Sequence, residues 1–172
     1  GTPFGGEATQ GMERFPYNTL NAENPGISGF GDLYQNINQM NLFISRTLHT
    51  DVLTESAKNY YLGQVYGLRA YYMYQLYRSW GDAVFTEEPS LGFEVGKLAK
   101  AATPAAEIFE QVKKDIESSL SYFGPDYTIK EKKSLWSKAA TLMLKADVYL
   151  WSAHRDGGEG DARTAKNALV DI

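Results

Sequence analysis

The stretch that decides the fold is residues 61–77, YLGQVYGLRAYYMYQLY. Its apolar and aromatic residues recur every three or four positions, the spacing that places side chains on one face of an α-helix. Such a wide face predicts a largely buried helix, which ends near Trp80 because Gly81 can take the left-handed conformation common at helix ends. The predicted stripe consists of Tyr61, Val65, Leu68, Tyr72 and Leu76, broadened by Tyr66, Ala70, Met73 and Tyr77.

Helical spacing also precedes and follows this stretch. Asp32 is the predicted N-cap of a helix that runs to about His49. After a surface loop over residues 82–102, Thr103 is the predicted N-cap of another helix, with Pro104 in the first helical position and Gly124 at its end. The expected apolar faces are Leu33, Ile37, Met40, Ile44 and Leu48 in the first of these helices, and Ile108, Val112, Ile116, Leu120 and Phe123 in the second.

Two further helices are predicted near the carboxyl end. Ser134 or Ser137 caps a helix whose face carries Trp136, Ala140, Met143, Ala146 or Asp147, and Leu150. A Gly-rich turn over residues 155–160 then leads to Asp161, the predicted cap of a fifth helix. Because that helix has no stop signal before Ile172, we expect the chain to be part of a longer protein.

Two helix pairs and half of a third predict an all-α fold, an irregular tetratricopeptide-like stack of αα-hairpins with long loop insertions. The first 31 residues carry seven of the 16 Gly, so residues 1–31 are predicted to be a loop-rich amino-terminal segment. Residues 32–172 are the predicted helical domain, truncated at its carboxyl end.

Composition excludes several functions. The net charge of −4 offers no basic surface for nucleic acid, and the absence of Cys removes thiolate chemistry and cysteine metal sites. The chain has only two His, His49 and His154, and neither lies in a catalytic motif, so no catalytic residue and no cofactor is predicted. Asp156, Glu159 and Asp161 lie in the Gly-rich turn, where helix capping is a better interpretation than Ca²⁺ binding because the spacing misses the EF-hand pattern.

Two features suggest binding. Arg69 lies inside an apolar helix, so it needs acceptors nearby and is interpreted as a structural clamp. The 12 Tyr, eight Phe and three Trp exceed what the helical faces use, and aromatic rings next to amides and carboxylates suit a non-catalytic sugar site. The predicted ligand-binding residues are Tyr17, Asn18, Asn21, Asn24, Phe30, Trp80 and Asp82.

Four segments in this order resemble the SusD/RagB-like glycan-binding lipoproteins of Bacteroides-type bacteria. They are residues 33–42, residues 62–77 with the Trp80-Gly81-Asp82 exit, residues 105–120, and residues 137–151. The sequence departs from the family pattern at Gly67, where a bulky residue is usual, at Val84, where Pro commonly follows the Gly-Asp exit, and at Phe30-Gly31, where a Trp often begins the first helix.

The resemblance implies a lipid-anchored protein of the outer membrane that is exposed at the cell surface. It would bind an oligosaccharide and deliver it to a TonB-dependent outer-membrane transporter, and its only membrane association would be an anchor outside these residues. Two alternatives stay open. One is a helical-repeat scaffold for protein–protein interaction without a sugar site, and the other is an all-helical glycoside hydrolase.

Overall fold

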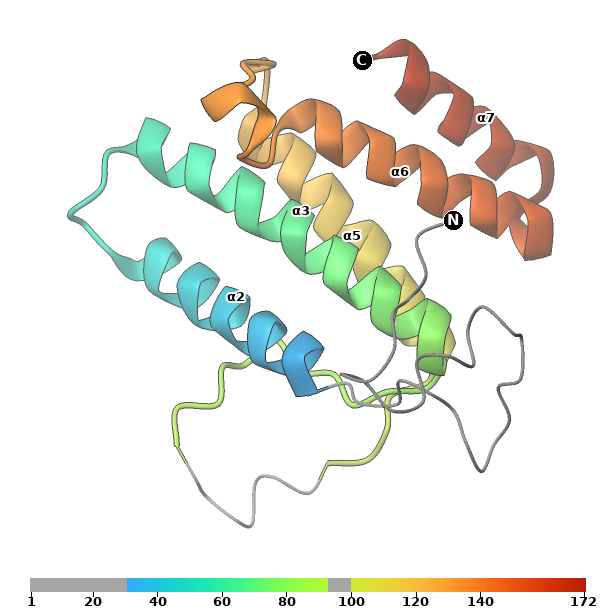
Figure 1. Cartoon of the computed structure of the whole chain (residues 1–172), viewed down its shortest axis with the longest axis horizontal. Coiled ribbons are helices and arrows are strands. Elements are labelled where there is room, and N and C mark those ends of the chain that lie inside the picture. Colours follow the sequence, from blue (N-terminus) through green and yellow to red (C-terminus); the bar gives the residue numbers. More distant parts are fainter. Residues whose placement is uncertain (1–30, 93–99) are drawn as a thin grey trace, which may run out of the picture. The chain divides into compact units, whose positions relative to one another are not determined.

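The structure is a computed structural model that describes residues 31–92 and 100–172 (Figure 1). Within these residues no strand occurs, only one isolated antiparallel bridge between Ala83 and Thr103. The all-α prediction is confirmed. The helices are α2 (Gly31–His49), α3 (Glu55–Trp80), α5 (Ala105–Phe123), α6 (Lys138–Ser152) and α7 (Gly158–Val170), with a 3₁₀ turn η2 (Glu131–Lys133) before α6 and a π-helical turn η3 (Ala153–Gly157) before α7.

Residues Leu33–Ile172 form one compact unit. Successive helices run in opposite directions, as Figure 1 shows, with α3 packed along α5 and α6 packed along α7. Helix α2 stands farther off, since none of its Cα atoms lies within 8 Å of a Cα atom of another described helix. It contacts the rest of the unit through its side chains. Ile37 is the α2 residue that belongs to the main hydrophobic core.

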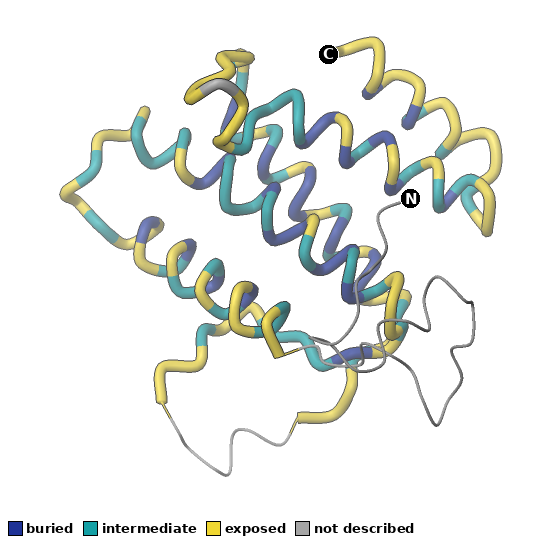
Figure 2. Tube along the Cα trace, viewed as in Figure 1, coloured by how far each residue is buried: buried dark blue, intermediate teal, exposed yellow. Residues whose placement is uncertain are grey.

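The core lies where α3, α5 and α6 face one another (Figure 2). In α5 the predicted face is confirmed at four positions, Ile108, Val112, Ile116 and Phe123, and Leu120 is partly buried. The polar residues Asn41, Arg69, Asp115, Ser119 and Thr141 are also buried. The described part of the chain contains no helix that is both long and apolar enough to cross a membrane.

The predicted face of α3 is confirmed at Ala70, Met73 and Leu76, which are buried, whereas Tyr61 is 42% exposed. The buried residues of the helix that the prediction left out are Leu62, Gly63, Gly67, Arg69 and Tyr74. Small residues explain the difference, because they let neighbouring aromatic rings approach the backbone. A Cβ atom at Gly63 would lie 3.0 Å from the Phe123 ring, and one at Gly67 would lie 2.1 Å from Trp136 Nε1.

The faces of α2 and α6 are also only partly predicted. In α2, Ile37 and Ile44 are buried as expected, but Leu48 is exposed and Thr47 takes its place. In α6, Met143 is 56% exposed and Leu150 is 61% exposed, so both predictions are wrong. The residues of α6 that are buried are Thr141, Leu142, Leu144, Ala146, Val148 and Ser152.

Several predicted helix ends are confirmed. Gly81 and Gly124 have positive φ values of 73° and 52°, and their N–H groups donate to carbonyls of the last turns of α3 and α5. Ser137, rather than Ser134, caps α6 by accepting from the Ala140 N–H.

Three predicted caps are wrong. Asp32 lies inside the first turn of α2, which already includes Gly31. Asp161 lies inside α7, because the Gly-rich stretch continues as the π-helical turn η3 and α7 begins at Gly158. Thr103 does not cap α5, because its backbone pairs with Ala83 and Pro104 is the N-cap residue.

Candidate functional site

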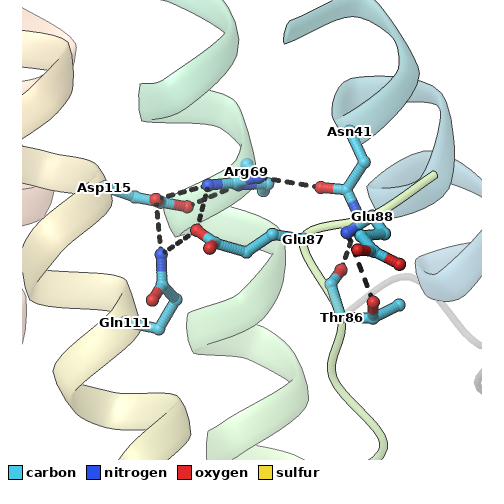
Figure 3. Close-up of polar contacts among 7 residues, drawn as sticks. All are labelled: Asn41, Arg69, Thr86, Glu87, Glu88, Gln111 and Asp115. Atoms are coloured by element: carbon cyan, nitrogen blue, oxygen red, sulfur yellow. Dashed lines mark hydrogen bonds and ion pairs between the residues drawn. The ribbon is translucent and has the colours of Figure 1, made fainter. Parts of the chain in front are cut away.

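A polar cluster, the Arg69 cluster (Asn41, Arg69, Glu87, Gln111 and Asp115), links three helices and a loop (Figure 3). Arg69 on α3 donates from Nε to Asp115 Oδ2 and from Nη2 to Asp115 Oδ1, both at 2.7 Å. Its Nη1 donates to Asn41 Oδ1 on α2 at 2.8 Å, and its Nη2 lies 3.5 Å from Glu87 Oε1 in the loop after α3. A guanidinium has five N–H groups, so this arrangement uses most of its donor capacity.

The burial of the central pair sets its electrostatics. Arg69 is 2% exposed and Asp115 is 1% exposed. Burial alone would lower the pKa of Arg69, but the hydrogen bonds and charge of Asp115 keep that pKa above its usual value. The guanidinium therefore stays charged, and the Tyr66 ring lies against it at 5.2 Å from its centroid.

Two asparagines of α2 hold the segment that follows α3. Asn41 Nδ2 donates to the Thr86 carbonyl at 2.6 Å, so this one amide contacts both Arg69 and the segment. Asn38 makes a two-point contact with the Ser90 backbone, accepting from its N–H at 2.7 Å and donating to its carbonyl at 3.2 Å. Residues 84–90, the clip segment, are thus attached along their length to α2.

The start of the clip segment is fixed against α5. Ala83 and Thr103 exchange two backbone hydrogen bonds of 3.2 and 2.9 Å. Asp82 Oδ1 accepts from the Ala105 N–H at 2.8 Å, which satisfies a donor at the beginning of α5. Asp82, which is distant in sequence from α5, therefore supplies the side-chain acceptor that the N-cap residue Pro104 does not provide.

A cavity of about 540 Å³ lies between α2 and the clip segment. Tyr34 and Ile37 on α2, together with Val84 and Phe85 on the clip segment, supply its apolar and aromatic surface. Burial raises the pKa of Tyr34, and a hydrogen bond with the backbone of Val84 opposes that rise. Gln35, Ser90 and Lys100 add polar groups to the lining.

The predicted ligand-binding residues fall into two groups. Tyr17, Asn18, Asn21, Asn24 and Phe30 lie outside the described residues. Trp80 ends α3 and is 37% exposed, and Asp82 follows it at the start of the connection to α5. Both residues lie near the carboxyl end of α3, just before the clip segment.

The cavity is not predicted from the sequence. The sequence predicts a helix at Tyr34 and a surface loop at Phe85, and neither prediction brings the two residues together. One signal could have indicated the arrangement: an apolar Ala83-Val84-Phe85 piece directly after a helix end suggests that the chain turns back onto the bundle. Nothing in the sequence pairs Asn38 with Ser90, because that contact depends on the tertiary fold.

Among the His, Asp and Glu residues that the structure describes, no group of three or more is placed to hold a metal ion. Asp161 instead lies directly against Gly157, where a Cβ atom would be 2.0 Å from Asp161 Oδ2. Asp161 thus packs at the junction of η3 and α7, whereas Asp156 and Glu159 are exposed.

The fold and the cavity define a stack of αα-hairpins with an aromatic-walled hollow beside the connection between α3 and α5. A SusD-like family model described as "Starch-binding associating with outer membrane" matches residues 15–150. The chain therefore belongs to this SusD-like family, and the predicted family is confirmed.

Solved structures give the same result. B. fragilis NanU is 51% identical with a TM-score of 0.86, covering 100% of this chain and 34% of that chain. A SusD superfamily protein from Bacteroides vulgatus is 50% identical with a TM-score of 0.84, covering 96% of this chain and 33% of that chain.

The SusD-like protein P38 of Formosa agariphila is 32% identical over 113 residues, 64% of this chain and 20% of that protein. The chain thus spans about a third of the length of these solved structures and a fifth of that relative.

Proposed function

We propose that the intact protein binds an oligosaccharide at the cell surface, without cleaving it, and delivers it to a TonB-dependent outer-membrane transporter while held to the membrane by a lipid anchor. The observation that carries the proposal is the aromatic-walled cavity between α2 and the clip segment, in a chain that belongs to a starch-binding family associated with the outer membrane.

The chemistry of the cavity suits a sugar. Pyranose rings present flat C–H faces that stack on aromatic rings, and the lining contains two such rings, Tyr34 on α2 and Phe85 on the clip segment. Small-ligand sites are typically concave, mostly apolar, and equipped with a few polar groups that fix orientation. Gln35, Ser90 and Lys100 can fill that role for hydroxyl groups.

We propose that the residues predicted from sequence also take part in ligand binding. Trp80 offers a partly exposed indole at the end of α3, and Asp82 offers a second carboxylate oxygen besides the one that caps α5. We propose that ligand-binding residues are also present in the loop-rich segment 1–31. They are Tyr17, Asn18, Asn21, Asn24 and Phe30.

Isothermal titration calorimetry tests the proposal with a panel of neutral and anionic oligosaccharides that begins with maltohexaose. We expect saturable binding of at least one of them. Phe85→Ala should weaken that binding about tenfold, because one lost stacking contact amounts to about 1.4 kcal/mol. Trp80→Ala should also weaken it.

Phe43→Ala is the matched control. Phe43 also lies on the surface of this unit and is 39% exposed, but it lines a different hollow near the end of α2. Its replacement should leave the affinity within about twofold. Equal losses in Phe43→Ala and Phe85→Ala would argue against the cavity as the sugar site.

The two alternatives predict different results. A protein–protein scaffold predicts no saturable binding to any oligosaccharide of the panel. A glycoside hydrolase predicts release of new reducing ends from the oligosaccharide that binds, and a reducing-end assay detects them. The proposed delivery partner is tested by purifying the intact protein from outer membranes and identifying a TonB-dependent transporter that copurifies with it.

A further inference from the structure

We propose that Glu87 is a positioning residue of the cavity: its carboxylate latches the clip segment to the buried Arg69–Asp115 pair and so sets the place of the wall that carries Phe85. This inference rests on the proposed function, because it concerns how that same cavity is kept in shape for a ligand.

Besides the packing of Phe85 against the core, the clip segment is held by side-chain contacts with the helices. It makes no regular secondary structure between the Ala83–Thr103 bridge and Gly92. Its polar contacts with the helices include four positions: Val84 with Tyr34, Thr86 with Asn41, Glu87 with the cluster, and Ser90 with Asn38. The contacts of Val84, Thr86 and Ser90 use their backbone, and Glu87 is the one of the four that uses its own side chain.

The geometry of Glu87 fits a latch. Its Oε1 accepts from Gln111 Nε2 on α5 at 2.9 Å and lies 3.5 Å from Arg69 Nη2 on α3 (Figure 3). Gln111 Nε2 also donates to Asp115 Oδ1 at 3.1 Å, so Glu87 joins a network that is already anchored. A single carboxylate thereby ties the loop to two helices.

The Glu87 side chain is 61% exposed, whereas those of Arg69 and Asp115 are 3% and 1% exposed. Removing the Glu87 carboxylate therefore leaves the buried Arg69–Asp115 ion pair in place, and the two opposite charges of that pair still balance. The fold should survive that change, whereas a change at Arg69 or Asp115 would leave a buried charge without its partner. Glu87 can thus be tested separately from the stability of the helical unit.

The neighbouring Glu88 provides a matched control. It has the same charge and is also exposed. Among the hydrogen bonds formed within the described residues, Glu88 takes part through its backbone N–H, which donates to Thr86 Oγ1 at 3.2 Å. Glu88→Ala removes the same charge from the same loop and leaves the latch in place.

Two readouts test the inference in the full 172-residue chain. The first is hydrogen–deuterium exchange of the peptide that covers residues 84–91, which includes the Ser90 N–H bonded to Asn38. The second is calorimetric affinity for the oligosaccharide that binds the wild-type protein best. Glu87→Ala, Glu87→Gln and Glu88→Ala are compared.

We expect Glu87→Ala to speed exchange of this peptide about three- to tenfold, the effect of losing one hydrogen bond, and to weaken oligosaccharide binding to a similar degree. Glu87→Gln keeps an acceptor oxygen and should give an intermediate effect in both measurements. Glu88→Ala should match the wild type, and all melting temperatures should stay within about 2 °C.

The inference is wrong if exchange of residues 84–91 does not change in Glu87→Ala, or if exchange rises while affinity stays the same. It is also wrong if Glu88→Ala has the same effects, since charge rather than contact would then be responsible. If the wild-type protein binds no oligosaccharide, the proposed function fails, and the exchange comparison alone still decides whether Glu87 holds the clip segment.

Discussion

Arg69 and Asp115 form a two-point contact across the interface of α3 and α5, with Nε–Oδ2 and Nη2–Oδ1 distances of 2.7 Å. Both α2 and the clip segment are attached to this buried ion pair, because Asn41 and Glu87 each contact the same guanidinium. A charged group in the middle of the helical unit thus organises the loop beside the proposed ligand site.

The coupling of this pair can be measured by a double-mutant cycle. Arg69→Met leaves Asp115 buried without its cation, and Asp115→Leu leaves Arg69 without its anion. Each single variant should lose about 3–5 kcal/mol of unfolding free energy in urea titrations. The double variant should recover much of that loss, because neither charge stays buried. A double variant as unstable as the sum of the single variants would contradict the pairing.

Because α3 lies close to Trp136, we expect that one methyl group added at Gly67 lowers the free energy of unfolding. A Cβ atom at Gly67 would lie 2.1 Å from Trp136 Nε1 and 2.9 Å from Thr141 Oγ1, which accepts from that indole at 2.8 Å. Gly67→Ala should therefore lower the unfolding free energy by about 1–3 kcal/mol. Gly160→Ala is the control, since no atom other than its chain neighbours and the nearby backbone of α7 lies within 4 Å of its Cβ position, and it should be neutral or stabilising.

Stability at alkaline pH should depend on Tyr74. Burial raises the pKa of Tyr74 to about 12, from 10.0 in an exposed tyrosine. The folded protein therefore keeps this proton at pH values where the unfolded chain loses it, so the contribution of Tyr74 is complete below pH 10 and is lost as the pH rises to about 12. The wild type should lose about 2–3 kcal/mol more than Tyr74→Phe over that range in urea titrations. Parallel pH profiles of the two proteins would contradict this.

Asp82 should have a structural role that can be separated from ligand binding. Its Oδ1 accepts from the Ala105 N–H, so Asp82→Ala should cost about 1 kcal/mol of unfolding free energy, the usual value of an N-cap. Asp82→Asn keeps an acceptor oxygen and should retain most of that stability. If Asp82→Asn is as unstable as Asp82→Ala, Asp82 does not stabilise the protein through this hydrogen bond.

Helix spans were largely predictable because their signals are local. The glycines after α3 and α5 end those helices, and Ser137 caps α6, through contacts within a few residues. The beginning of α5 was not predictable in detail, since the donor of its first turn is satisfied by Asp82, 23 positions earlier.

The buried faces were harder to predict, because this core does not follow apolar residues alone. Thr141 is completely buried, since its hydroxyl group joins Ser119 and Trp136 in hydrogen bonds, whereas Met143 in the same helix is exposed. Apolar spacing alone therefore predicts Met143 and Leu150 as buried, although both are exposed. The need of Arg69 for acceptors followed from its burial in an apolar helix, but their identity required the tertiary fold.

The most direct measurement is a crystal structure of the protein with the oligosaccharide that binds in calorimetry. The account predicts a sugar ring between α2 and the clip segment, stacked on Phe85 or Tyr34, with Glu87 still against Arg69 and Gln111. A sugar bound elsewhere on the chain, touching neither aromatic ring, would contradict it.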